Sequence, residues 1–151
     1  MTPAQHVSAS PAAAGPAPRR LRIAIIEDEA LVAFELETHL TEAGHEVVGV
    51  ADTLEDALLL AQATQPDLAL VDVQLAGGSC GLDVARALHA LGIACLYSTG
   101  NCAGLARTDA VACLHKPYGR RQLRDAVAAA GVSSRAMASA AATASSSCRL
   151  P

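Results

Sequence analysis

The chain has 151 residues, which is enough for one domain with a hydrophobic core. Hydrophobic residues make up 52% of the sequence and aromatic residues only 2%, so the core must be built mainly from Ala, Leu and Val. The formal net charge of −4 argues against a surface that binds nucleic acid or an anionic membrane, because there is no excess of basic residues to neutralise phosphates.

The two ends of the chain have a biased composition. Residues 1–20 are rich in Ala and Pro and are predicted to be a disordered arm, without the apolar region of a secretory signal. Residues 132–151 form a low-complexity Ala/Ser tail with too little apolar surface to fold alone. No stretch is apolar for long enough to span a bilayer. We therefore expect one folded domain, residues 21–131, in a cytoplasmic protein without an output domain.

Five short apolar runs lie within the predicted domain. They are rich in aliphatic residues and nearly continuous, as expected for strands that are buried on both faces. The runs cover residues 23–26, 47–50, 68–71, 93–97 and 111–114.

Helical patterns follow these runs. In the first, Leu36 and Leu40 fall on one face, and Gly44 is placed to end the helix. Thr53 and Asp56 have the spacing of a capping box at the start of the second. The alternation of strands and helices predicts an α/β fold, with a parallel sheet covered by helices on both faces. The predicted helices cover residues 29–43, 54–63, 82–91 and 119–130.

Five cysteines are present, and the number is odd. No C-x-x-C spacing occurs, and Cys95 and Cys113 lie inside apolar runs. This usage favours reduced thiols in a reducing compartment over a disulfide framework or a zinc site. The other cysteines are Cys80, Cys102 and Cys148.

Polar residues follow four of the five apolar runs. Glu27 and Asp28 follow the first run, and Asp72 follows the third. Thr99 and Lys116 follow the fourth and fifth runs. In a parallel sheet these carboxyl ends share one edge, where ligands bind at the point at which the strand order reverses. Each residue alone could be a helix cap, a turn residue or a solvated side chain, but their joint placement indicates a functional site.

The charges at this edge predict a metal. Three carboxylates and one ammonium group leave a net charge of −2, which one Mg²⁺ would neutralise. An ionised aspartate beside Mg²⁺, an ammonium group and a hydroxyl group is equipped to attack phosphorus and form an aspartyl-phosphate.

The motifs IIEDE, LVDVQL, STGN and HKPY occur in register with the predicted strands. Together they resemble the receiver domain of two-component response regulators, and in particular stand-alone receivers of the chemotaxis-regulator type. The resemblance covers residues 21–131. It implies a flavodoxin-like, doubly wound, five-stranded sheet in the order 2-1-3-4-5. It also implies a histidine kinase or a histidine phosphotransfer protein as the phosphoryl donor.

The resemblance implies a role for each residue of the reacting group. Asp72 would accept the phosphoryl group, Thr99 would donate a hydrogen bond to one phosphoryl oxygen, and Lys116 would pair with another. A cis peptide between Lys116 and Pro117 would aim the Lys116 amine at the phosphoryl site.

The resemblance implies a magnesium site as well. Asp28 would contact Mg²⁺ directly, and Glu27 would act through water. Asp72 and the backbone carbonyl of Gln74 would complete the protein ligands.

Two features depart from the family pattern. The interval from Thr99 to Lys116 is short, so we expect a shortened fourth helix, either a single turn or a loop. Cys113 occupies the position three before Lys116, where many receivers carry an aromatic side chain that changes rotamer on phosphorylation. We therefore expect the switch to act by ordering residues 100–110.

Three functions are compatible with these residues. The first is a receiver that signals to a downstream protein by contact and is not an enzyme beyond its own phosphorylation and dephosphorylation. The second is a degenerate receiver that takes no phosphate, against which the intact Asp72, Thr99 and Lys116 argue. The third is an aspartyl-phosphate phosphatase of the haloacid dehalogenase type. Gln74 stands where that family has a second aspartate, which argues against this reading.

Overall fold

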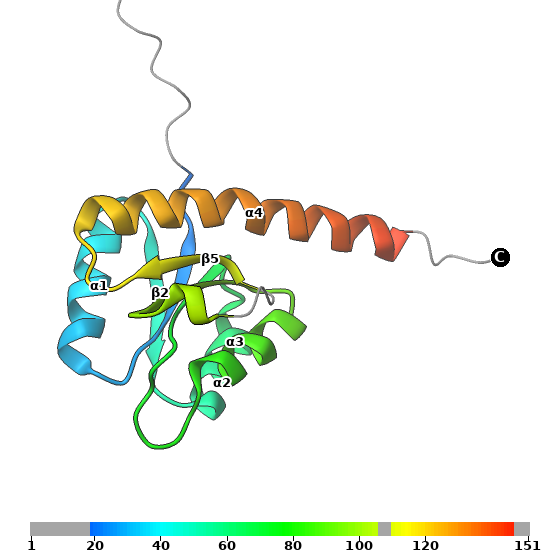
Figure 1. Ribbon diagram of the computed structural model, residues 1–151. Helices are drawn as coiled ribbons and strands as arrows, with labels where there is room; N and C mark the ends of the chain where they lie inside the picture. Colours follow the sequence, from blue (N-terminus) through cyan, green and yellow to red (C-terminus); the bar gives the residue numbers. More distant parts are fainter. Residues whose placement is uncertain (1–18, 106–109, 147–151) are drawn as a thin grey trace, which may run out of the picture.

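The computed structural model describes residues 19–105 and 110–146 (Figure 1). Five parallel strands form one sheet in the order β2-β1-β3-β4-β5, which confirms the predicted α/β fold and strand order. All five strands overlap the apolar runs of the sequence. Their bounds are β1 (Arg22–Ile26), β2 (Glu46–Ala51), β3 (Leu68–Asp72), β4 (Ala94–Thr99) and β5 (Ala110–His115).

Helices cover both faces of the sheet. The bounds of the helices are α1 (Ala30–Glu42), α2 (Leu54–Thr64), α3 (Gly81–Ala90) and α4 (Arg120–Ser146). Helices α1 and α4 pack on one face, where Leu36 and Leu123 meet Ile25, and α2 and α3 pack on the other, where Val84 meets Val71. Because neighbouring residues of a strand point to opposite faces, each strand contributes to both cores.

Local signals in the sequence fix the ends of two helices. The Thr53 hydroxyl accepts a hydrogen bond from the backbone N–H of Asp56 at 3.1 Å and so caps the start of α2. Gly44 ends α1 with a φ of 91°, in the left-handed region that favours glycine.

The connection between β4 and β5 is short. In the described residues between β4 and β5, the only helical element is the 3₁₀ turn η1 (Cys102–Gly104), which agrees with the predicted shortening of the fourth helix. The predicted switch segment, residues 100–110, includes residues 106–109, which lie outside the described residues.

The last helix is longer than predicted. Helix α4 does not end near residue 131 but continues to Ser146, through much of the predicted Ala/Ser tail. Alanine has the highest intrinsic helix propensity, and the domain supports the extension. The Ser134 hydroxyl donates a hydrogen bond to the backbone oxygen of Asp67 at 2.9 Å, and Met137 packs against the core. Of the predicted N-terminal arm, only Arg19 and Arg20 are described.

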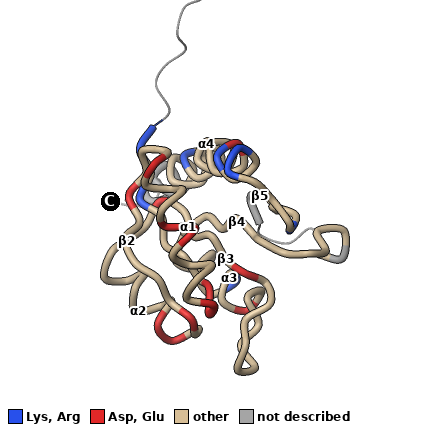
Figure 2. The backbone as a smooth tube through the Cα atoms, turned by 90° about the vertical axis from the view of Figure 1, so that its left-hand side faces the viewer, with Lys and Arg blue, Asp and Glu red and all other residues tan. Residues whose placement is uncertain are grey.

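Charge is distributed unevenly over the elements. Acidic residues lie around α1 and α2, and basic residues lie on α4 (Figure 2). Across the described ranges, no helix combines the length and the apolar character needed to cross a bilayer.

Candidate functional site

The carboxyl ends of β1, β3 and β5 surround an open cavity of about 550 Å³. Five of the six predicted site residues line it: Glu27, Asp28, Asp72, Gln74 and Lys116. Residues from distant parts of the chain therefore meet at one edge of the sheet, as the strand order requires.

Asp72 is the last residue of β3, and only 7% of its side chain is exposed. Its Oδ1 atom accepts a hydrogen bond from the backbone N–H of Gln74 at 2.9 Å. Its Oδ2 atom lies 2.8 Å from the Nζ atom of Lys116. The buried carboxylate thus has one backbone donor and one cation as partners, which offsets the cost of removing it from water.

Lys116 reaches Asp72 from the loop after β5. The Lys116–Pro117 peptide is cis, as the resemblance implied. Burial opposes a charge on Lys116, but the hydrogen bond to Asp72 and the negative charges of Asp72 and Glu27 outweigh it and raise the pKa of the amine. Lys116 is therefore a permanent ammonium group at neutral pH.

Glu27 and Asp28 follow β1 directly. The Oε1 atom of Glu27 accepts a hydrogen bond from the backbone N–H of Glu29 at 3.1 Å, and the Oδ2 atom of Asp28 accepts one from Ala76 at 2.8 Å. Burial, followed by the negative charges of Asp72 and Asp28, raises the pKa of Glu27 from 4.5 to about 6. The site therefore contains more negative charge than Lys116 alone compensates.

The carboxylates of this edge fit a divalent cation. One oxygen atom from each of Glu27, Asp28 and Asp72 lies within 4.8 Å of the others. Hard oxygen donors of this kind suit Mg²⁺, and a cation here would offset the negative charges of Asp72 and Asp28, which add to burial in raising the pKa of Glu27. Gln74 lines the same cavity, and the role of its carbonyl group stays a prediction.

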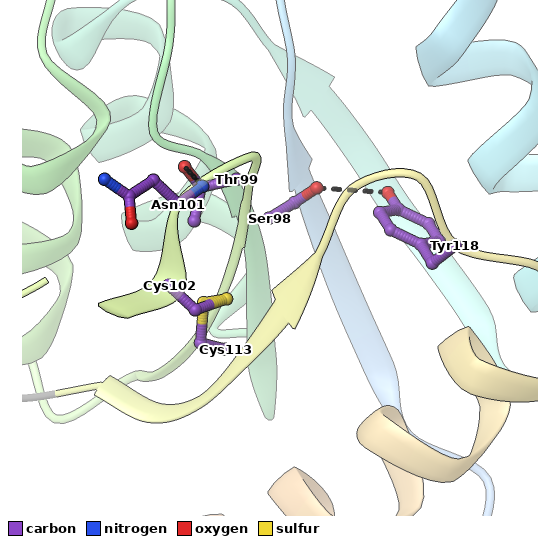
Figure 3. Close-up of a disulfide and its surroundings, with 6 residues drawn as sticks. All are labelled: Ser98, Thr99, Asn101, Cys102, Cys113 and Tyr118. Atoms are coloured by element: carbon purple, nitrogen blue, oxygen red, sulfur yellow. Dashed lines mark hydrogen bonds between the residues drawn. A yellow bond between two sulfur atoms is a disulfide. The ribbon is translucent and has the colours of Figure 1, made fainter. Parts of the chain in front are cut away.

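Thr99 is the one predicted site residue that does not line the cavity among the described residues. It is the buried last residue of β4, and its neighbour Ser98 pairs with Asp72 in the register of β3 and β4. The Thr99 hydroxyl accepts a hydrogen bond from the backbone N–H of Asn101 at 3.3 Å (Figure 3). The hydroxyl is thus engaged by the turn that follows β4.

Gly81 supports the site in a way that sequence reasoning missed. It is the first residue of α3, and a Cβ atom at this position would lie only 1.9 Å from the backbone oxygen of Asp72. Its N–H donates a hydrogen bond to the backbone oxygen of Val73 at 3.2 Å. Only glycine allows α3 to begin in contact with the chain that carries Asp72. No signal in the sequence separates Gly81 from the nearby Gly77 and Gly78.

Tyr118 is a second contact that the sequence analysis did not predict. Its phenolic oxygen accepts a hydrogen bond from the Ser98 hydroxyl at 3.2 Å, so the loop after β5 is linked to the end of β4 (Figure 3). Burial raises the pKa of Tyr118, which therefore stays neutral.

The cysteine prediction is wrong for two residues. Cys102 and Cys113 form a disulfide with a Cα–Cα distance of 6.0 Å (Figure 3). The 3₁₀ turn after β4 brings Cys102 beside β5, and no spacing rule in the sequence reveals that turn. Within the described ranges Cys80 and Cys95 are free thiols, as predicted, and Cys148 lies outside those ranges.

Residues 23–128 match the response regulator receiver domain, which is most of the chain. The chain therefore belongs to the family of response regulator receiver domains of two-component signalling. Receiver domains are regulatory rather than metabolic enzymes, and they generally bind Mg²⁺ through acidic residues such as the cluster described above.

Individual relatives are other response regulators. The chain is 48% identical over 67 residues to the phyllosphere-induced regulator PhyR of Methylorubrum extorquens. The aligned stretch covers 44% of this chain and 25% of that protein. It is 45% identical over 58 residues to the transcriptional regulatory protein PdtaR of Mycobacterium tuberculosis, covering 38% of this chain and 27% of that protein. The matched part is thus about a quarter of the length of these relatives.

Solved structures agree with the fold. The response regulator PhyR from Brucella abortus superposes with a TM-score of 0.72 at 32% identity, over 82% of this chain and 53% of that chain. The receiver domain of Erythrobacter litoralis PhyR superposes with a TM-score of 0.67 at 27% identity, over 74% of this chain and 89% of that chain.

Proposed function

We propose that this receiver accepts a phosphoryl group on Asp72 from a phosphohistidine and transmits the signal by contact with other proteins. The observation that carries the proposal is the buried Asp72 carboxylate, 2.8 Å from Lys116 and clustered with Glu27 and Asp28. The donor would be a histidine kinase or a histidine phosphotransfer protein, and the reaction would take place in the cytoplasm.

The residues have complementary roles in this reaction. A carboxylate oxygen of Asp72 forms a bond to phosphorus while the bond from phosphorus to the donor imidazole breaks, and the imidazole keeps the electron pair. Lys116 then pairs with a phosphoryl oxygen instead of with Asp72 alone. The Thr99 hydroxyl leaves Asn101 and donates a hydrogen bond to another phosphoryl oxygen.

A magnesium ion would be held by Asp28, Asp72 and the carbonyl group of Gln74, with Glu27 acting through water. When bound, it supplies positive charge that shields the phosphoryl oxygens from the carboxylates. The chain's own contribution is to orient the Asp72 carboxylate through the Gln74 N–H and the Lys116 amine.

A surface for the donor protein lies next to the site. Helix α1 begins just after Asp28, and its Leu31 and Phe34 side chains are each 66% exposed. A groove of about 470 Å³ runs between α1 and the loop that contains Lys116 and Tyr118. Exposed apolar side chains beside a reactive carboxylate favour a protein as the phosphoryl donor.

Incubation with acetyl phosphate and Mg²⁺, followed by intact mass measurement, tests the proposal. We expect the addition of one phosphoryl group, which is absent from Asp72→Asn and greatly reduced in Lys116→Ala. A mass gain that survives Asp72→Asn would refute the assignment of Asp72. No gain at all would favour the degenerate receiver, and continuous release of phosphate at enzymatic rates would favour the phosphatase.

A further inference from the structure

The disulfide between Cys102 and Cys113 lies on the side of the sheet edge where Thr99 is held. Cys113 is on β5, where it pairs with Tyr97 of β4, and it lies three residues before Lys116. Cys102 begins the 3₁₀ turn three residues after Thr99. The two sulfur atoms therefore connect the segments that carry two residues of the proposed phosphoryl site.

A short chain of contacts links the disulfide to the Thr99 hydroxyl. Asn101 donates its backbone N–H to that hydroxyl at 3.3 Å, and Asn101 is bonded directly to Cys102. The N–H of Leu105 closes the turn on the backbone oxygen of Cys102 at 3.2 Å. Movement of the Thr99 hydroxyl towards a phosphoryl group must break the contact with Asn101, and the turn must adjust.

The disulfide restricts that adjustment. A disulfide keeps its Cα atoms within about 7 Å of each other, and they are 6.0 Å apart here. The connection from Thr99 to Cys102 is fixed by the sheet at one end and by the sulfur–sulfur bond at the other. When the bond is reduced, only the sheet end stays fixed, and the turn is free to follow the hydroxyl.

The other cysteines of the described residues, Cys80 and Cys95, belong to no disulfide. Cys95 is fully buried, and burial raises its pKa to about 12, so its thiolate is scarce at neutral pH. Cys80 is exposed and free. Cys102 and Cys113 are each partly exposed, which leaves them accessible to a small oxidant or to a reducing dithiol.

We propose that Cys102 and Cys113 form a reversible thiol–disulfide pair that makes the response to phosphorylation at Asp72 depend on redox state. In the oxidised form the disulfide holds the turn after Thr99 in place, which weakens binding of the phosphoryl group by the Thr99 hydroxyl. The proposal rests on the proposed function of Asp72. Cytosolic disulfides are usually transient and redox-sensing, which agrees with a pair that is reduced at rest and bonded under oxidation.

The redox chemistry is balanced with a peroxide as the oxidant. One thiolate attacks the O–O bond of hydrogen peroxide, which gives a sulfenic acid and, after protonation, one water molecule. The second thiol then attacks the sulfenic sulfur, the S–S bond forms, and a second water molecule leaves. Two electrons pass from the thiols to the peroxide. A reducing dithiol reverses the change by thiol–disulfide exchange.

The test uses the full chain with Cys80→Ser and Cys148→Ser, so that other pairings are excluded. One sample is oxidised with hydrogen peroxide and another is reduced with dithiothreitol, and the reagents are removed. Non-reducing mass measurement verifies the loss of two hydrogen atoms in the oxidised monomer. Each form is then titrated with beryllofluoride in the presence of Mg²⁺ by calorimetry, and labelled with acetyl phosphate.

We expect the oxidised form to bind beryllofluoride at least about fivefold more weakly than the reduced form, the lower end of typical couplings between sites. Further substitution of Cys102→Ser or Cys113→Ser should give peroxide-insensitive protein with the affinity of the reduced form. Equal or tighter binding by the oxidised form overturns the proposal, as does a disulfide that forms only between two chains. Failure of both forms to bind and to be phosphorylated overturns the proposed function of Asp72, and the coupling with it.

Discussion

At the residue scale, the site contains three carboxylates whose negative charge is only partly compensated by Lys116. Lys116 forms a salt bridge with Asp72, but among the described residues the neighbouring carboxylates Glu27 and Asp28 form none. Burial, and after it the negative charges of Asp72 and Asp28, raise the pKa of Glu27. The clustered carboxylates that equip the site for its reaction therefore also reduce the stability of the fold locally, which is common for reactive sites.

Removal of one carboxylate should separate stability from function. We expect Asp28→Asn to raise the free energy of unfolding of the metal-free protein by about 1 kcal/mol, the size of the repulsion between two charges at about 4 Å in water. The asparagine oxygen can still accept the hydrogen bond from Ala76. The same variant should lose Mg²⁺-dependent phosphorylation. Urea unfolding and acetyl phosphate labelling measure the two effects.

Asp125→Asn is the matched control, because Asp125 is an exposed carboxylate on α4 whose ion pair with Arg121 is long, at 4.0 Å. It should change neither stability nor labelling beyond experimental error. A destabilised Asp28→Asn protein would show that the hydrogen bond to Ala76 matters more than the repulsion.

His45 should make stability depend on pH. It is buried, its Nδ1 atom accepts a hydrogen bond from the backbone N–H of Leu21 at 3.2 Å, and burial lowers its pKa from 6.5. The unfolded chain therefore binds a proton more readily than the folded chain, so His45 costs no stability above pH 6.5 and destabilises the fold as the pH falls below it. We expect the free energy of unfolding of the wild type to fall relative to that of His45→Gln as the pH is lowered from 7.5 to 5.

Urea titrations of both proteins at each pH provide the measurement, and the difference between the two proteins isolates the histidine. Glu27 acts in the opposite direction in the same interval, because its pKa is raised to about 6 in the folded state. The comparison with His45→Gln cancels that contribution. Parallel pH curves for the two proteins would contradict the prediction.

At the element scale, the beginning of α3 sets the position of Asp72. A methyl group at position 81 would collide with the backbone oxygen of Asp72, which no side-chain rotation can relieve. We expect Gly81→Ala to cost about 1–3 kcal/mol of stability, as for other overpacked sites, and to slow phosphorylation. In Gly119→Ala the new methyl group meets only the Oε1 atom of Gln122, at 4.0 Å, so this variant should be nearly neutral in both assays.

The elements also show what the sequence could predict. The strands and the parallel sheet followed from the apolar runs and their alternation with helical patterns, because burial on both faces leaves a continuous pattern. The strand order came from the resemblance to receiver domains, and the structure confirms it. The length of α4 did not follow from the sequence. The extension is supported by contacts of Ser134 and Met137 with the domain, and the Ala/Ser-rich composition of this segment does not reveal those contacts. The roles of Cys102, Cys113 and Gly81 depend on backbone approach between distant segments, which residue type alone does not reveal.

At the scale of the whole molecule, the disulfide should contribute to stability by closing a loop over a sequence separation of 11 residues. Loop-closure estimates for this length give about 2–3 kcal/mol. We expect dithiothreitol to reduce the free energy of unfolding in urea by about this amount in the wild type. The pair of substitutions Cys102→Ser and Cys113→Ser should remove the effect of dithiothreitol, whereas Cys80→Ser should leave it unchanged.

Helices α1 and α2, on opposite faces of the sheet, should differ in how much they contribute to binding a protein that donates the phosphoryl group. Phe34 is 66% exposed on α1, the helix that begins just after Asp28, and Leu59 is 58% exposed on α2, which covers the opposite face of the sheet. We expect Phe34→Glu to slow phosphotransfer from a cognate histidine kinase or phosphotransfer protein by about tenfold or more, because a charge would replace an apolar contact. Labelling by acetyl phosphate, which needs no protein surface, should be unchanged.

Leu59→Glu makes the same chemical change away from the site and should affect neither reaction. Radiolabelled phosphotransfer and intact mass measurement on the same preparations compare the two donors. If Phe34→Glu slowed both reactions equally, the substitution would be acting on the site itself. If Leu59→Glu alone slowed phosphotransfer, the donor would dock on α2, and the assignment of α1 as the docking surface would be wrong.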